Sequence, residues 1–187
     1  MQCSHIYKNG VDVTIVSSGA VACGRHLLSK GNIEEDDIQD RQVEAVFGQP
    51  TLIGAWVAAF RKYGVKAGQA LITENDEEFL VSADNDRLAA FVATTVKADT
   101  VLILTDVEGV LDTNNDLIED GSLIKDDVPF YQSSEKGTGG MTSKVRVLKE
   151  LSNQGVKGII AGAKQQNIIL KAARGNTRGI STTFQAH

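Results

Sequence analysis

A glycine-rich segment that ends in a lysine is the part of this sequence best suited to chemistry. It reads Gly137-Thr138-Gly139-Gly140-Met141-Thr142-Ser143-Lys144. Glycines let the backbone approach a bulky anion closely, and a lysine ammonium acts as a mobile point charge against phosphate. Apolar residues follow at helical spacing from 145 to 154, which places Lys144 in the first turn of a predicted helix, where anions are favoured. The segment predicts a phosphate site, although glycines also mark ordinary turns.

A second candidate is Ser17-Ser18-Gly19-Ala20, which closes a β-branched stretch and opens a predicted helix. Backbone N–H groups at a helix start, together with a serine hydroxyl, can bind a carboxylate or a phosphate. The simpler alternative is a serine that caps the helix and binds no ligand.

Acidic and amide side chains gather in two neighbouring segments, Glu74-Asn75-Asp76-Glu77-Glu78 and Asp84-Asn85-Asp86. Carboxylates and amides before a helix often only cap it, and Asp84 or Asn85 fits that interpretation. The functional alternative is that these groups bind an amino group, orient a lysine or help to hold Mg²⁺, which prefers oxygen ligands and substrate phosphates.

Thr105 and Asp106 directly follow a short β-branched apolar stretch. A turn at the end of a strand is the simplest interpretation. The functional alternative is that Thr105 or Asp106 contacts the adenine, ribose or phosphate of a nucleotide. The aromatic residues between 47 and 63 lie at helical spacing, which is typical of core or interface positions.

Strand-like and helix-like segments alternate along the chain and would position these groups. Strands are predicted at 11–16, 65–72, 100–104, 157–161 and 182–184, and helices at 20–28, 38–47, 50–63, 85–96, 144–153 and 166–174. Residues 114–132 are polar and predict a surface excursion. Such alternation predicts an α/β fold with a mostly parallel sheet and helices on both faces, where ligands bind beyond the carboxyl ends of the strands.

The composition excludes several classes of protein. The 187 residues carry a net charge of −5, which argues against general nucleic-acid binding. The sequence suggests no apolar run long enough to span a bilayer and no signal peptide. Cys3 and Cys23 predict neither a disulfide framework nor a metal site. We expect a reduced, cytoplasmic protein that contacts neither nucleic acid nor membrane.

The motifs together resemble the amino-acid kinase superfamily, and within it most closely the glutamate 5-kinase family. The matching segments are 16–22, Gly48-Gln49, 68–73, Glu74-Asn75-Asp76, Asp84-Asn85-Asp86, 104–109 and 137–144. The resemblance implies a three-layer α/β/α sandwich of the carbamate-kinase-like type. It would form a single domain with a substrate-binding lobe over about residues 1–100 and a nucleotide-binding lobe over about residues 101–187, without a C-terminal PUA domain.

The resemblance also implies an activity. Family members use ATP and Mg²⁺ to phosphorylate the side-chain carboxylate of L-glutamate to L-glutamyl 5-phosphate, the first step of proline biosynthesis. The family pattern further implies a homo-oligomer, a dimer or tetramer, with proline as a possible feedback inhibitor. Phosphoryl transfer of this kind depends mainly on positioning and charge neutralisation.

For the substrate, the resemblance implies two groups of residues. Ser18, Gly19 and Ala20 would contact the glutamate. Asp76 and Asn85 would hold its amino and carboxylate groups.

For catalysis and ATP, the resemblance implies that Lys144 contacts the phosphates and that Asp86 organises the catalytic lysines by a charge pair. Thr105 and Asp106 would line the nucleotide site. The backbone around the phosphates would come from Gly139, Gly140 and Met141. The sequence assigns no residue as a metal ligand.

Two features depart from the family pattern. Family members begin with a strand that carries Lys-x-Gly-Ser, which has no counterpart here, and they place a helix and a strand where Thr73 runs straight into Glu74. The chain could therefore be a catalytically impaired relative that binds nucleotide or glutamate, or a sequence that lacks segments of an active enzyme. A kinase for N-acetylglutamate or aspartate is a further alternative.

Overall fold

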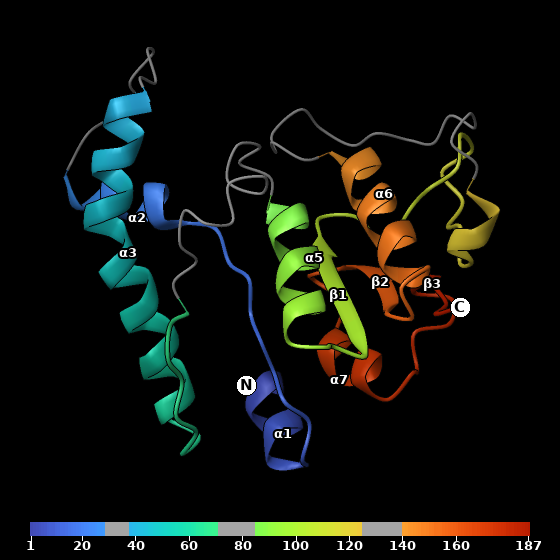
Figure 1. Cartoon of the computed structure of the whole chain (residues 1–187), viewed down its shortest axis with the longest axis horizontal. Helices are drawn as coiled ribbons and strands as arrows, with labels where there is room; N and C mark the ends of the chain where they lie inside the picture. Colours follow the sequence, from blue (N-terminus) through green and yellow to red (C-terminus); the bar gives the residue numbers. More distant parts are fainter. Residues whose placement is uncertain (29–37, 71–84, 125–139) are drawn as a thin grey trace. The chain divides into compact units, whose positions relative to one another are not determined.

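The computed structural model describes residues 1–28, 38–70, 85–124 and 140–187 (Figure 1). The chain divides into two compact units, Cys3–Thr73 with Met1, and Glu74–His187 with Gln2. The lobe boundary expected near residue 100 stays a prediction.

Three helices account for the regular structure described before residue 70. They are α1 (Gln2–Lys8), α2 (Ala20–Leu27) and α3 (Ile38–Arg61). The helix predicted at 20–28 is thereby confirmed. The strand predicted at 11–16 is wrong, and residues 65–70 likewise form no strand. Extended backbone becomes a β-strand only when a neighbour completes its hydrogen-bond ladder, and these two segments have no such partner among the described residues.

Helix α3 replaces the two helices predicted on either side of Pro50. It runs through Pro50 without interruption for 24 residues. Proline lacks the N–H that would bond to the carbonyl of Val46, so the helix loses one backbone hydrogen bond at this point. The prediction of two helices was therefore wrong, because one missing bond did not end the helix.

Two glycines let α2 and α3 meet backbone to backbone. A Cβ atom added at Gly48 would overlap the carbonyl oxygen of Ala20 and the amide nitrogen of Gly24. A Cβ atom added at Gly24 would overlap the carbonyl oxygen of Glu44. No larger residue fits either position without separating the helices, so this pair of glycines fixes how closely α2 packs on α3.

By length and composition alone, the 23 residues Gln39–Arg61 of α3 could cross a membrane. The expectation that the sequence contains no such run is wrong in this respect. The run was missed because Pro50 divided it into two predicted helices.

The second unit contains a sheet of three strands, β1 (Thr100–Thr105), β2 (Lys157–Gly162) and β3 (Ser181–Phe184), in the order β1-β2-β3. β1 and β2 are parallel, with Thr105 opposite Gly162. β3 is antiparallel to β2, with Ser181 opposite Ala161. The strands predicted at 100–104, 157–161 and 182–184 are confirmed, and the sheet is mixed where a mostly parallel one was expected.

Helices cover both faces of this sheet, as Figure 1 shows for α5 (Asn85–Thr95) and α6 (Met141–Ser152) on one face and α7 (Ile168–Ala173) on the other. Alternate strand residues supply the two cores. Ile103 and Ile160 pack with α5 and α6, whereas Ile159 packs with α7. The unit is thus a three-layer α/β/α arrangement, as predicted.

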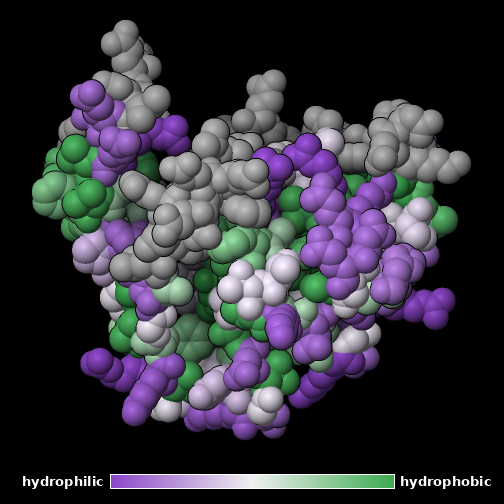
Figure 2. All heavy atoms as spheres, viewed as in Figure 1, coloured by the Kyte–Doolittle hydropathy of each residue, from purple (hydrophilic) through white to green (hydrophobic). Residues whose placement is uncertain are grey.

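Helix α6 is amphipathic, which explains its position over the sheet. The side chains of Val145, Leu148 and Leu151 are buried on its inner face, and hydrophilic side chains cover its outer surface (Figure 2). It begins at Met141, three residues before the predicted start. Between β1 and α6 the described chain includes one short 3₁₀ helix, η2 (Gly121–Leu123), within the predicted polar excursion.

Candidate active site

The topology of the second unit brings two helix starts and two strand ends to one edge. Residues 96–99 join α5 to β1, and residues 153–156 join α6 to β2. After such short connections each helix runs antiparallel to the strand that follows it, so its first turn lies beside the carboxyl end of that strand (Figure 1). In α/β sheets this is the edge where ligands bind.

An ion pair joins the two helix starts at this edge. The ammonium of Lys144, in the first turn of α6, donates to Oδ2 of Asp86, in the first turn of α5, at 2.8 Å. The two side chains are 20% and 11% exposed, so the pair is largely shielded but Lys144 can still be reached from solvent. The predicted charge pair is present, and its effect on a phosphate stays a prediction.

The start of α6 is open on the side of Gly140, as far as the described residues extend. Gly140 is the N-cap residue of α6, and no atom of the described residues lies within 4 Å of a Cβ atom built on it. The side chain of Met141 is buried in the core, so toward a phosphate this residue can offer only its backbone. The open space above Gly140 and the positive end of the helix dipole fit the phosphate site predicted from the sequence.

Thr105 and Asp106 leave β1 at the same edge. The Thr105 hydroxyl donates to Oδ1 of Asp106 at 3.1 Å, and the Asp106 side chain is exposed. The carbonyl of Thr105 accepts the N–H of Ala163 at 2.7 Å, which ties the exits of β1 and β2 together. The exposed Asp106 carboxylate can accept hydrogen bonds from ribose hydroxyls, and the half-buried Thr105 hydroxyl lies beside it.

In the first unit, Ser18, Gly19 and Ala20 form the start of α2. Ser18 is exposed, and Gly19 is the N-cap residue with φ of 118°, a conformation that L residues rarely adopt. The Ser17 hydroxyl donates to the carbonyl of Ser18 at 3.0 Å. The segment is thus a tight turn into a helix, as expected for a site that offers backbone N–H groups.

Three of the predicted site residues are Asp76, Asn85 and Gly139. Asp76 and Gly139 lie outside the described residues. Asn85 is exposed at the first position of α5, next to the buried Asp86. Within the described ranges no group of three His, Cys, Asp or Glu side chains could hold a metal ion.

Sequence reasoning missed a buried ion pair between the last turn of α2 and α3. The Nε and Nη2 atoms of Arg25 donate to both carboxylate oxygens of Glu44 over 3.0 to 3.2 Å. The Glu44 side chain is fully buried, whereas that of Arg25 is 35% exposed. A carboxylate within the apolar stretch of a predicted helix was the available signal, because such a group needs a partner when buried.

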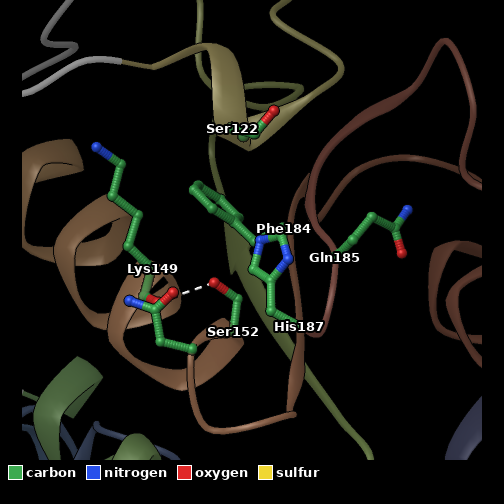
Figure 3. A pocket seen from close by; sticks show the side chains of 8 residues that line it. Ser122, Lys149, Ser152, Phe184, Gln185 and His187 are labelled. Atoms are coloured by element: carbon green, nitrogen blue, oxygen red, sulfur yellow. Dashed lines mark hydrogen bonds between the residues drawn. The ribbon is translucent and has the colours of Figure 1, made fainter.

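A separate pocket lies at the far end of α6, away from the predicted site residues. Lys149, Ser152, Phe184 and His187 are among its lining residues, together with Ser122 of η2 (Figure 3). Its volume is about 170 Å³. Ligand pockets typically measure about 300–1,000 Å³, so this pocket is too small for a nucleotide.

Comparison with known proteins finds a family match for part of the chain. Residues 71–162 match the Amino acid kinase family, a range that includes Asp86, Thr105, Asp106 and Lys144.

Several curated relatives match almost the whole chain. A glutamate 5-kinase from Methanosarcina barkeri is 31% identical over 229 residues, covering 99% of this chain and 59% of the relative. Glutamate 5-kinases from Caldanaerobacter subterraneus subsp. tengcongensis and Mycobacterium tuberculosis are 30% and 32% identical, covering 98% and 96% of this chain and 60% and 57% of theirs.

This chain thus spans about three-fifths of the length of these relatives. The aligned 229 residues also exceed the 187 residues of this chain, so the Methanosarcina relative contains internal residues that have no counterpart here. An internal shortening of this kind was expected where Thr73 meets Glu74. The chain is thus similar to the amino acid kinase family over residues 71–162 and to glutamate 5-kinases over almost its whole length, and the α/β/α architecture of the second unit agrees with that similarity.

Proposed function

We propose that this chain carries the site of an ATP-dependent glutamate 5-kinase, which phosphorylates the side-chain carboxylate of L-glutamate to L-glutamyl 5-phosphate. The observation that carries the proposal is the Lys144–Asp86 ion pair at the glycine-rich start of α6. The glutamate 5-kinases among the similar proteins support the choice of substrate. The place of the reaction at the start of proline biosynthesis follows from the family resemblance.

In this reaction a glutamate carboxylate oxygen forms a bond to the γ-phosphorus of ATP, and the bond between that phosphorus and the bridging oxygen to the β-phosphate breaks, leaving ADP. The attacking group is the substrate carboxylate, so the protein needs no nucleophile of its own. Its task is to hold both anions together and to offset their charge.

Lys144 would supply positive charge to the transferred phosphoryl group. Asp86 holds its ammonium at 2.8 Å, which limits the positions that the long lysine side chain can take. A lysine positioned before the reaction stabilises the developing charge without reorganisation during it. The open backbone at Gly140 would admit the phosphates, and Thr105 and Asp106 would line the nucleotide.

Mg²⁺ would neutralise the phosphate charge when it is bound with ATP. The ATP phosphates would supply oxygen ligands, which Mg²⁺ prefers. Ser18, Gly19 and Ala20 would contact the glutamate, with Asn85 and Asp76 binding its amino and carboxylate groups. The proposal includes a homo-oligomer, a cytoplasmic location and proline as a feedback inhibitor, following the family pattern.

The test is ADP release with Mg²⁺, ATP and a panel of L-glutamate, N-acetylglutamate and L-aspartate. Release that depends on L-glutamate, and that falls at least 100-fold in Lys144→Ala, is the expected result for a lost electrostatic donor. Lys149→Ala is the matched control, because it removes a positive charge from the last turn of the same helix.

Two other outcomes would redirect the proposal. Turnover that depends on N-acetylglutamate or L-aspartate would assign a different substrate to the same fold. Binding of ATP without turnover with any of the three would assign the alternative role of a nucleotide-binding relative with impaired catalysis.

A further inference from the structure

The chain after β1 crosses the sheet before it turns away. Residues Asp106–Val110, here called the crossing loop, leave β1, pass the carboxyl end of the neighbouring β2 and reach β3. A Cβ atom on Gly162, the last residue of β2, would lie 3.2 Å from the carbonyl oxygen of Val107 and 3.4 Å from Cα of Glu108. The middle of the crossing loop therefore rests directly on the backbone of β2.

The far end of the crossing loop is held by one side chain of β3. The Val110 N–H donates to the hydroxyl oxygen of Thr182 at 2.8 Å, across 72 residues of sequence. The same hydroxyl donates to the carbonyl of Ile118 at 2.7 Å. Thr182 and Val110 are both fully buried. A single hydroxyl thus satisfies a backbone donor and a backbone acceptor that water cannot reach.

The crossing loop packs so closely against this hydroxyl that position 109 has no room for a side chain. A Cβ atom on Gly109 would lie 2.8 Å from the Thr182 hydroxyl oxygen and 2.9 Å from its amide nitrogen. The loop backbone consequently contacts β3 itself at this point. On the β1 side the Thr105 carbonyl accepts the Ala163 N–H and the Thr105 hydroxyl donates to Asp106, and on the β3 side the loop is held through Thr182.

We propose that Thr182 is a positioning residue for nucleotide binding: its buried hydroxyl fixes the crossing loop and so keeps Thr105 and Asp106 in place at the edge that receives ATP. The inference rests on the proposed function, because it assigns the nucleotide to this edge.

Two variants of Thr182 separate the role of its hydroxyl from that of its methyl group. Thr182→Val keeps the volume and removes both hydrogen bonds, whereas Thr182→Ser keeps the hydroxyl and removes the methyl group. Thr183→Val is the matched control, since it removes a hydroxyl from the next residue of β3. The Thr183 hydroxyl lies 3.5 Å from the Ser181 hydroxyl, and among the described hydrogen bonds it makes none to the crossing loop.

The experiment measures binding of Mg·ATP to the full chain by calorimetry, together with amide hydrogen exchange over residues 106–118. In Thr182→Val we expect the Kd to rise about tenfold, as it does when the population of the binding-competent loop falls to about one tenth. Exchange at the amides of Val110 and Ile118 should accelerate in the same variant. Thr182→Ser and Thr183→Val should bind within about twofold of the unaltered chain, which is small beside that shift.

Two results would overturn the inference in distinguishable ways. If the unaltered chain binds ATP and Thr182→Val binds it equally well, the positioning role is refuted while the proposed function stands. If the unaltered chain does not bind Mg·ATP at all, the proposed function fails and the positioning role fails with it. A loss of affinity in Thr183→Val equal to that in Thr182→Val would also refute a specific role for Thr182.

Discussion

Removing Arg25 should destabilise the first unit more than neutralising its partner Glu44. The Glu44 side chain is fully buried, so Arg25→Ala leaves a carboxylate in the interior without a counter-charge. Loss of one partner of a buried ion pair costs about 3–5 kcal/mol of unfolding free energy. Because the Arg25 side chain is 35% exposed and partly screened by water, we expect a value at the lower end, about 3 kcal/mol.

Glu44→Gln removes the buried negative charge and keeps Arg25. The glutamine keeps the shape and an amide oxygen as acceptor, and the partly exposed Arg25 can turn its guanidinium toward water. We therefore expect a loss of about 1.5 kcal/mol, the lower end of the net value of a hydrogen bond to a charged group. The double variant, Arg25→Ala with Glu44→Gln, should be more stable than Arg25→Ala alone, since no buried charge is left unpaired.

Urea unfolding followed by tryptophan fluorescence measures these differences. Trp56 is the single tryptophan of the chain and lies in α3, with its ring 6.3 Å from that of Phe60, so it reports on this helix pair. The midpoint should shift without a change in the slope of the transition. Glu44→Gln that destabilises as much as Arg25→Ala, or a double variant whose loss is the sum of the two, would refute the reasoning.

Three further predictions concern other contacts. Gly48→Ala should lower the melting temperature, because its Cβ would overlap the backbone of α2 and overpacking costs about 1–3 kcal/mol. At Gly54 in the same helix a Cβ meets no atom of the described residues within 4 Å, so Gly54→Ala should gain about 1 kcal/mol in unfolding free energy; equal melting temperatures would contradict this. Asp86→Asn should lower the unfolding free energy by about 1–2 kcal/mol, since the partly buried ammonium of Lys144 loses its counter-charge. Urea unfolding followed by circular dichroism measures the change, and an unchanged midpoint would refute the prediction. The hydrogen bond from the Ser122 N–H lowers the pKa of Asp120 from 3.8, so the stability that Asp120 contributes is present above pH 3.8 and is lost as the pH falls through the lower pKa of the folded state. Asp120→Asn should therefore be less stable than the unaltered chain at pH 6, and the difference should shrink by pH 2. A difference that stays constant with pH would argue against the lowered pKa.

Local patterns predicted most elements of the second unit. β1 and β2 are short β-branched apolar runs, and α6 has apolar residues at helical spacing, so periodicity was sufficient to find them. Their order also placed Thr105, Asp106 and Lys144 at one edge, because parallel strands bring their carboxyl ends together. The ion pair of Lys144 with Asp86 followed from the family resemblance and is present in the structure, at 2.8 Å.

The remaining features depend on contacts between distant residues. Residues 11–16 have a strand-like composition, but a strand needs a partner that composition does not specify. Pro50 suggested a helix end, yet packing of α3 against α2 extends across it. The partners Glu44 and Arg25 are 19 residues apart, and Thr182 and Val110 are 72 apart, so no local pattern reveals either contact.

The proposed activity of this chain is transfer of a phosphoryl group from ATP to the glutamate side-chain carboxylate. The most direct test is to trap the acyl phosphate with hydroxylamine, which converts L-glutamyl 5-phosphate to the γ-hydroxamate. We predict a hydroxamate that requires ATP, Mg²⁺ and L-glutamate together and that is lost in Lys144→Ala but retained in Lys149→Ala. ADP release without any hydroxamate, or hydroxamate formation that survives Lys144→Ala, would contradict it.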